Sequence, residues 1–239
     1  MPDASAGTTL LSVRGLHAWY GESHILHGIE FDVQQGEVVT LLGRNGAGKT
    51  TTLKAIMGMV GRRTGSVLYE GQETIELPSN RIARQGIAFC PEERGIFASL
   101  DVEENLLLPP AVRPGGLSVE AIFDLFPNLK ERLRSQGTKL SGGEQQMLAI
   151  ARILRTGARL LLLDEPTEGL APVIIEQIGR TIQRLKQDGF TILLVEQNFR
   201  FAGTVADRHY VVDRGKVIDM IPNPQLDANM DKLHEYLGV

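Results

Sequence analysis

The sequence has few of the features that mark secreted, membrane-spanning or nucleic-acid-binding proteins. It holds one cysteine, Cys90, so no disulfide can form within the chain, and a reducing compartment fits. No apolar run approaches the ~18 residues that a membrane-spanning helix needs, and no charged segment followed by an apolar one opens the chain. The net charge of −4 supplies no basic field for nucleic acid, so DNA binding is disfavoured.

Apolar segments of two periodicities alternate along the chain. β-Branched or leucine-rich runs, such as 38–42 and 160–163, are typical of strands buried on both faces. Longer segments with apolar residues three and four apart, such as 173–186, predict helices. This alternation indicates an α/β fold with a parallel sheet. The predicted strands are 11–13, 29–33, 37–42, 66–70, 87–90, 160–163, 191–195 and a hairpin of 210–212 with 217–218. One helix is predicted to begin at Lys49, and the others are predicted at 102–108, 119–126, 129–133, 144–154 and 173–186. A turn is predicted between Gly61 and Gly65.

Residues 43–50 match the phosphate-binding pattern G-x-x-x-x-G-K-[ST]. They lie between a predicted buried strand and a helix, the context that the pattern requires. Glycines let the main chain aim its N–H groups at phosphate oxygens, and a helix start adds positive potential. Lys49 is expected to reach the β- and γ-phosphates and the Thr50 hydroxyl to ligate Mg²⁺. The predicted nucleotide-binding residues of this phosphate loop are Gly43, Arg44, Asn45, Gly46, Ala47, Gly48, Lys49, Thr50 and Thr51.

Two carboxylates follow the leucine-rich run 160–163. Ligands bind at the carboxyl ends of strands in open α/β sheets, so Asp164 and Glu165 are expected beside the phosphate loop. Asp164 would hold Mg²⁺, and Glu165 would polarise the attacking water. The alternative is a solvated turn before Pro166, which the phosphate loop in the same chain disfavours.

A second glycine loop, Ser141-Gly142-Gly143-Glu144, precedes the helix predicted from Glu144. A serine three residues before a glutamate is a capping box, which stabilises a helix start. Capping explains Ser141 and Glu144 but not two consecutive glycines, which cost backbone entropy at that place. Glycines there allow close approach of another main chain or a ligand.

With these three elements in this order, the chain resembles the nucleotide-binding subunit of ATP-binding cassette (ABC) transporters from about Leu11 onward. The resemblance implies a phosphate-loop ATPase core with a parallel sheet, an antiparallel β subdomain and a helical insert. The small, polar residues at the start of the chain predict a disordered tail at 1–8. The resemblance implies a single domain over 9–239, with a helical subdomain at 93–150. It also implies ATP and Mg²⁺ as cofactors. In that family an aromatic residue stacks on adenine, a role that we assign to Tyr20, whose alternative is a strand-edge tyrosine.

The resemblance also assigns the second loop a role across a dimer. In the family, the Ser-Gly-Gly loop caps the γ-phosphate held by the other subunit, so Ser141, Gly142, Gly143 and Glu144 are expected to contact ATP in trans.

Three positions depart from the commonest family pattern. Glu92 stands where most members have a glutamine that touches Mg²⁺; it could still ligate the ion but adds a negative charge. Residues 168–171 read Glu-Gly-Leu-Ala, so the aspartate that reaches across the dimer is missing. Gln197 stands where a histidine contacts the γ-phosphate; glutamine donates a hydrogen bond but carries no charge. The five histidines, expected at surface or packing positions instead, are His17, His24, His27, His209 and His234.

This combination is similar to the second of two ATPases in bacterial branched-chain amino acid importers, and the ending 237–239 fits that branch. The implied partners are a paralogous ATPase, with a homodimer as the alternative, two membrane permeases and, indirectly, a periplasmic binding protein. No nucleic acid is implied. The implied location is peripheral, at the cytoplasmic face of the inner membrane. Phe97, Leu100 and Val102 would help to form the surface that meets the permease, or would simply pack the helical insert.

Other functions stay open at this point. A relative that carries urea, amides or other amino acids would share the pattern. DNA-repair ATPases share the three motifs but insert long coiled coils, whereas only 92 positions separate Lys49 from Ser141 (141 − 49). Ribosome-associated relatives normally join two cassettes in one chain, and this chain holds one.

Overall fold

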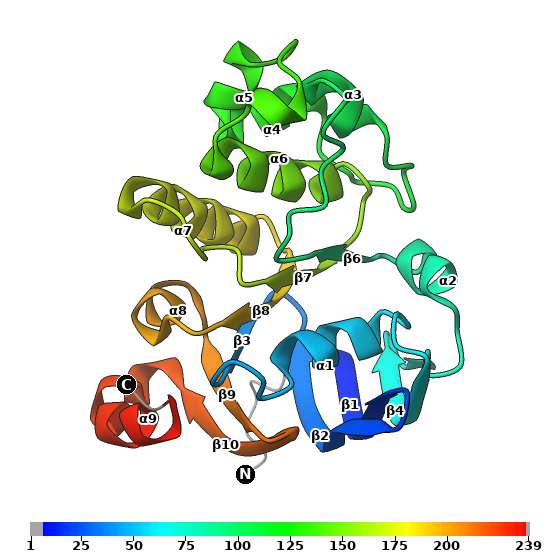
Figure 1. Cartoon of the computed structure of the whole chain (residues 1–239), viewed down its shortest axis with the longest axis vertical. Helices are drawn as coiled ribbons and strands as arrows, with labels where there is room; N and C mark the ends of the chain where they lie inside the picture. Colours follow the sequence, from blue (N-terminus) through cyan, green and yellow to red (C-terminus); the bar gives the residue numbers. More distant parts are fainter. Residues whose placement is uncertain (1–6, 238–239) are drawn as a thin grey trace.

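The computed structural model describes residues 7–237, which form two sheets flanked by helices (Figure 1). The larger sheet has six strands in the order β10-β9-β3-β8-β7-β6. All neighbouring pairs are parallel except β9 and β10, which form a hairpin. Its strands are β3 (Val38–Leu42), β6 (Ile87–Cys90), β7 (Leu160–Asp164), β8 (Thr191–Glu196), β9 (Arg208–Asp213) and β10 (Lys216–Pro222).

The three central strands of this sheet are buried along their whole length. Every residue of β3, β7 and β8 is buried. Their continuous apolar sequences therefore suit a parallel sheet that is covered on both faces. The covering helices are α1 (Lys49–Ile56), α6 (Gly142–Leu154), α7 (Pro172–Gln187) and α8 (Phe199–Val205).

The smaller sheet is antiparallel, with the order β2-β1-β4-β5. Along β1 the buried residues alternate in part with exposed ones, so that one face meets the core. Leu11, Leu16 and Leu26 are fully buried there and join a core cluster with residues of β3 and β8. The strands are β1 (Thr9–Tyr20), β2 (Ser23–Gln34), β4 (Arg62–Tyr69) and β5 (Gln72–Glu73). The antiparallel β subdomain expected from the family resemblance is confirmed.

A group of helices lies between β6 and β7 in sequence and beyond α7 in space, in green at the top of Figure 1. They are α3 (Val102–Leu107), α4 (Val119–Leu125), α5 (Pro127–Glu131) and α6. Their apolar side chains join a second core cluster with β7 and β8. Figure 1 also shows α2 (Ser79–Arg84) beside β6, and α9 (Met230–Leu237) beside β10. Residues 1–6 of the expected disordered tail and the predicted ending at 238–239 lie outside the described residues.

One turn prediction is wrong, because Gly65 lies inside β4 rather than at the end of a turn. Its φ is +111°, and a Cβ there would lie 2.3 Å from the carbonyl oxygen of Gly15 on β1. The pairing of β1 with β4 shifts register between Arg14 and His17. Gly65 therefore marks an irregularity where two strands approach closely, and a glycine in a strand has the same sequence signal as one in a turn.

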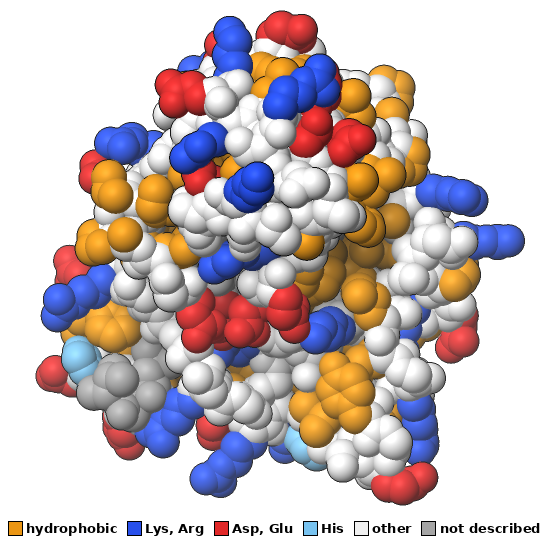
Figure 2. Space-filling view, turned by 45° about the horizontal axis from the view of Figure 1, so that its top comes forward, with side chains coloured by type: hydrophobic (Ala, Val, Ile, Leu, Met, Phe, Trp, Pro, Cys, Tyr) orange, Lys and Arg blue, Asp and Glu red, His pale blue; other side chains and the backbone are white. Residues whose placement is uncertain are grey.

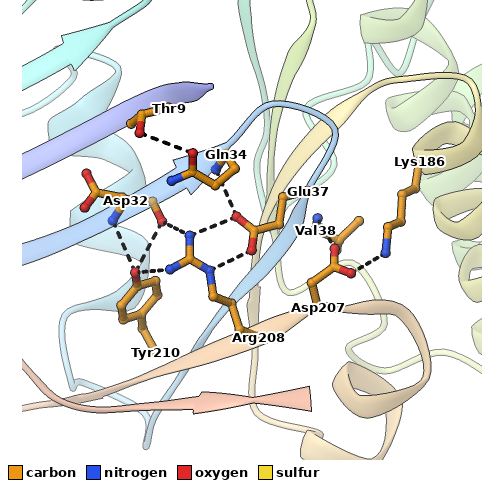
Figure 3. A network of polar contacts seen from close by, with 9 residues as sticks. All are labelled: Thr9, Asp32, Gln34, Glu37, Val38, Lys186, Asp207, Arg208 and Tyr210. Atoms are coloured by element: carbon orange, nitrogen blue, oxygen red, sulfur yellow. Dashed lines mark hydrogen bonds and ion pairs between the residues drawn. The ribbon is translucent and has the colours of Figure 1, made fainter. Parts of the chain in front are cut away.

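A polar network joins the two sheets at the amino-terminal ends of the parallel strands (Figure 3). The Arg208 guanidinium donates to both carboxylate oxygens of Glu37, at 2.6 and 2.9 Å. It also donates to the main-chain oxygen of Asp32 on β2, at 2.8 Å, and to the Tyr210 hydroxyl, at 2.7 Å. Nearby, Asp207 accepts from the main-chain N–H of Val38, at 2.9 Å. These contacts fix the antiparallel sheet against β3 and β9.

Candidate nucleotide site

The phosphate loop connects the end of β3 to the start of α1, as predicted. Gly43 packs so closely on β9 that a Cβ would lie 2.4 Å from the Val212 carbonyl oxygen. Gly48 precedes α1 with a φ of +106°, and a Cβ there would lie 2.9 Å from Leu26 Cδ2. Both positions therefore require glycine for conformational and steric reasons. The loop thus wraps the amino-terminal end of α1, where main-chain N–H groups are free to bind anions.

Lys49 lies at the centre of the loop and is 4% exposed. Its Nζ donates to the carbonyl oxygens of Gly43, at 2.8 Å, and Arg44, at 3.1 Å. It lies 3.3 Å from Oε1 of Glu165, which is itself 8% exposed. Opposite charges at this distance attract each other, more strongly when they are buried than when they are in water. The two side chains thus lie together at the carboxyl ends of β3 and β7.

Thr50 and Asp164 form a second pair of predicted residues that the fold brings together. The Thr50 hydroxyl donates to Oδ1 of Asp164, at 2.9 Å. Oδ2 of Asp164 is buried and has no hydrogen-bond partner within the described residues. Burial, with Glu165 and Glu92 nearby, raises the pKa of Asp164 to about 6 against the opposing bond from Thr50. This carboxylate is therefore costly to hold without a further cation or donor.

Gln197 bonds directly to Glu165, the predicted general base. Its Nε2 donates to Oε2 of Glu165, at 2.7 Å. The Glu165 main chain has a φ of +44°, a strained value for a residue with a side chain. Its N–H donates to the Val195 carbonyl oxygen, at 3.0 Å. Glu165 is thus held by Lys49 on one oxygen and Gln197 on the other.

A pocket of about 470 Å³ opens at this edge of the sheet. Figure 2 shows acidic and basic side chains gathered on the face that carries it. Eight predicted site residues line it, together with Ile25 and Glu168, which the sequence reasoning did not assign. The predicted residues in the lining are Asn45, Gly46, Gly48, Lys49, Thr50, Thr51, Glu92 and Glu165.

Four predicted nucleotide-binding residues are absent from the pocket lining, as are Asp164 and Gln197. Gly43 packs against β9, and buried Ala47 accepts from the Gly215 N–H through its carbonyl, at 2.8 Å. The Arg44 side chain contacts α9. Tyr20, at the end of β1, is 46% exposed. Its stacking on adenine therefore stays a prediction.

Sequence reasoning missed Glu196, the residue before Gln197. Its carboxylate is 3% exposed and accepts from the Thr167 hydroxyl, at 2.7 Å, and from the Asn198 N–H, at 3.4 Å. Burial and nearby Glu165 raise the pKa of Glu196 to about 7. A glutamate inside an otherwise apolar strand, 191–196, was the available signal.

Comparison with known proteins agrees with this geometry. The family model described as "ABC transporter" matches residues 26–168, which span the phosphate loop, the second glycine loop and the acidic strand end. The chain belongs to the ABC transporter family. It is an ABC ATPase, the ATP-binding and ATP-hydrolysing kind of subunit.

Two curated relatives cover most of this ABC ATPase. The high-affinity branched-chain amino acid transport ATP-binding protein BraG of Pseudomonas aeruginosa is 42% identical over 238 residues, which cover 96% of this chain and all of that protein. The probable branched-chain amino acid transport ATP-binding protein LivF of Archaeoglobus fulgidus is 39% identical, covering 84% and 87%. The solved structure of a nucleotide-free ATP-binding cassette from an ABC transporter superposes with a TM-score of 0.82 at 23% identity, covering 96% and 98%, and so supports the fold.

The second glycine loop of the ABC ATPase begins α6, outside the pocket lining. Both bonds of the predicted capping box are present: Ser141 N–H donates to Glu144 Oε2, at 2.7 Å, and Glu144 N–H to Ser141 Oγ, at 3.3 Å. A Cβ on Gly143 would lie 2.9 Å from Ile174 of α7. Packing within the chain thus gives a second reason for this glycine. The contact of this loop with ATP in a dimer stays a prediction.

The three residues expected at a permease surface differ in exposure. Phe97 is 49% exposed, and Leu100 is half-buried. Val102 is fully buried at the start of α3, so its assignment to a surface is wrong. Asp101 forms a capping box at the start of α3, and the side chain of Val102, the first residue of the helix, packs in the second core cluster. Exposed Leu107 and Leu108 lie at the other end of that helix.

The histidines occupy packing or surface positions, as expected. His209 is fully buried, between the Thr40 hydroxyl at 2.6 Å and Asn223 Oδ1 at 3.0 Å. Burial lowers its pKa. The other four lie at ring contacts: His17 and His24 against Trp19, His27 against His24, and His234 against Phe199.

Proposed function

We propose that this ABC ATPase drives the uptake of branched-chain or related amino acids, as one of two ATPase subunits of an importer. The observation that carries the solute class is its 42% identity, over nearly the whole chain, to a branched-chain amino acid transport ATPase. The glutamine and glutamate at positions 197 and 92, unusual for the wider family, support the same branch.

The chemistry rests on three side chains that converge on the pocket. Glu165 is the base that takes a proton from the attacking water. Its two oxygens are oriented by Lys49 and Gln197, the latter through a bond of 2.7 Å. Because glutamine does not titrate, Gln197 holds Glu165 in the same orientation across the neutral pH range. Lys49 is the residue that binds the β- and γ-phosphates.

The donor set fits a magnesium ion. Thr50 and Asp164 offer a hydroxyl and a buried carboxylate oxygen without a partner, and Glu92 lies at the same pocket. Mg²⁺ is usually held by one or two protein oxygens together with phosphates and water. When bound, the ion would neutralise charge on the β- and γ-phosphates.

The partners follow from the incomplete site. The Ser141–Glu144 loop lies outside the pocket of its own chain, so we propose that it completes the ATP site of a paralogous ATPase, with the homodimer as the alternative. Exposed Phe97 would contact one of two permeases, which a periplasmic binding protein supplies with solute. No helix within 7–237 is long and apolar enough to cross a membrane. From the resemblance to importer ATPases, we propose a peripheral location at the cytoplasmic face of the inner membrane.

Reconstitution tests this function. The chain is assembled in vesicles with the proposed permeases and second ATPase, with ATP inside and the binding protein outside. Uptake of radiolabelled leucine, isoleucine or valine that needs ATP and disappears with Glu165→Gln is expected.

The second candidate is a urea or amide importer. Uptake of urea or acetamide with no uptake of the three amino acids would replace the proposed solute and leave the ATPase role intact. Binding of the purified complex to DNA or ribosomes in place of permeases would contradict the transport role.

A further inference from the structure

Arg44, the second residue of the phosphate loop, extends its side chain onto α9. Its Nε donates to the carbonyl oxygen of Tyr236, at 2.9 Å, and its Nη2 to that of Glu235, at 2.8 Å. Both acceptors lie in the last turn of α9, where carbonyl groups have no partner within the helix. The guanidinium therefore satisfies two main-chain acceptors and opposes the negative end of the helix dipole.

The main chain of Arg44 faces the nucleotide side. Its carbonyl oxygen accepts from Lys49 Nζ, at 3.1 Å, and from the Ala47 N–H, also at 3.1 Å. One residue thus connects the phosphate-binding lysine with α9. A movement of the loop at Arg44 would therefore change its distances to Lys49 and to α9.

A second contact joins α9 to the other side of the pocket. Leu233 of α9 is fully buried in a cluster with Leu42, the residue before the phosphate loop, and Phe199, two residues after Gln197. The His234 ring contacts the Phe199 ring edge-on, with 5.3 Å between centroids. Helix α9 therefore packs behind both segments that hold Glu165 and Lys49.

We propose that α9 is a positioning element of the nucleotide site, with Arg44 as the residue that couples its docking to nucleotide binding. Binding is then tighter when α9 is docked, and by thermodynamic reciprocity nucleotide stabilises the docked helix by the same factor. This coupling involves only the phosphate loop and α9, so it holds whatever solute the transporter carries.

The first test measures affinity for MgADP, which avoids turnover, by calorimetry. Arg44→Ala is expected to weaken binding about two- to five-fold, the range for a cation at a helix end. Arg180→Ala is the matched control, since it removes an exposed arginine from α7 and should bind as the unaltered protein does. Arg44→Lys, which keeps the charge but has a single donor nitrogen in place of the two that bond α9, should lie between.

The second test separates coupling from a local defect in the loop. Leu233→Ala loosens α9 without touching the phosphate loop, and Arg44→Ala in that background should cause little further loss of affinity. Hydrogen exchange over 230–237 should slow about two- to five-fold on adding MgADP in the unaltered protein. In Arg44→Ala this slowing should disappear.

Either of two results overturns the inference. One is equal protection of α9 by MgADP in Arg44→Ala and the unaltered protein. The other is additive loss of affinity in the double variant, which would confine the Arg44 effect to the loop. Neither outcome bears on amino acid uptake, because the unaltered protein would still bind nucleotide.

Discussion

The two ends of the central parallel strands differ in how their carboxylates are paired. At the amino-terminal end, Glu37 and Arg208 bond through both carboxylate oxygens, and further contacts occupy the guanidinium. At the carboxyl end, Asp164 keeps a buried oxygen without a partner, and burial raises its pKa and that of Glu196. The comparison shows that the Glu37–Arg208 pair, which stabilises the fold, is bonded through both carboxylate oxygens, whereas Asp164, at the ligand end, keeps one oxygen without a partner among the described residues.

The largest expected effect is the loss of hydrolysis in Glu165→Gln. Removal of a general base should lower kcat by about 10²- to 10⁴-fold. ATP binding should survive and trap the ATP-bound dimer, because the amide can still occupy the site between Lys49 and Gln197. Phosphate release and filter binding measure the two quantities. Glu93→Gln, an exposed acid near the same edge, is the control; similar turnover in both variants would remove Glu165 from the role of base.

A stability effect should come from the other end of the sheet. Arg208→Ala leaves the half-buried Glu37 carboxylate without its partner and should lower the free energy of unfolding by about 2–3 kcal/mol. Turnover per folded molecule should stay unchanged, since the network lies at the opposite strand ends. Urea unfolding and active-site titration check this. A fall in kcat with unaltered stability would contradict the division of roles between the two ends.

A smaller effect, dependent on pH, is expected at Glu196. Its pKa of about 7 lies above the ordinary value of 4.5, so the folded state binds the proton more tightly than the unfolded state. The group therefore adds stability below pH 4.5, and that contribution is lost as pH rises from there to about 7. Glu196→Gln should remove this loss, so the Tm of the variant relative to that of the unaltered protein should be higher at pH 8 than at pH 5. Parallel melting profiles for both proteins would contradict the raised pKa.

A further effect, on the rate rather than on stability, is expected at Gln197. Loss of one hydrogen bond to the Glu165 carboxylate, worth about 1.5–3 kcal/mol, should lower kcat roughly ten- to hundred-fold in Gln197→Ala. Gln197→His restores a donor and should recover part of the rate, with a pH dependence near neutrality that the glutamine lacks. Rates at several pH values test this. Equal rates in all three proteins would show that residue 197 does not orient the base.

The apolar periodicity of the sequence predicted the long buried strands and the long amphipathic helix. The buried strands at 38–42, 160–163 and 191–195 and the helix at 173–186 were found to within a few residues, because their apolar periodicity is long and regular. Helices α2 and α8 were missed, since they have only six and seven residues and little periodicity. Residues 62–64, placed outside any strand, belong to β4, because pairing with β1 overrides the signal of Gly65.

The candidate site was also predicted only in part. The motifs predicted the roles of five residues, because phosphate and water chemistry require such groups at strand ends: Lys49, Thr50, Asp164, Glu165 and Gln197. Side-chain directions and burial could not be read from it. The side chain of Arg44 contacts α9 from 191 positions away, and Val102 proved to be buried rather than exposed.

The motifs and their order carried the resemblance to the family, and local composition and spacing predicted the parallel core and the residues of the phosphate loop. The pairing of charges, the bond from Gln197 to Glu165 and the packing of α9 behind the nucleotide site became visible only in the folded chain. The physical reason is distance along the chain: these contacts join residues 32 to 192 positions apart, and their energies depend on burial that exists only after folding.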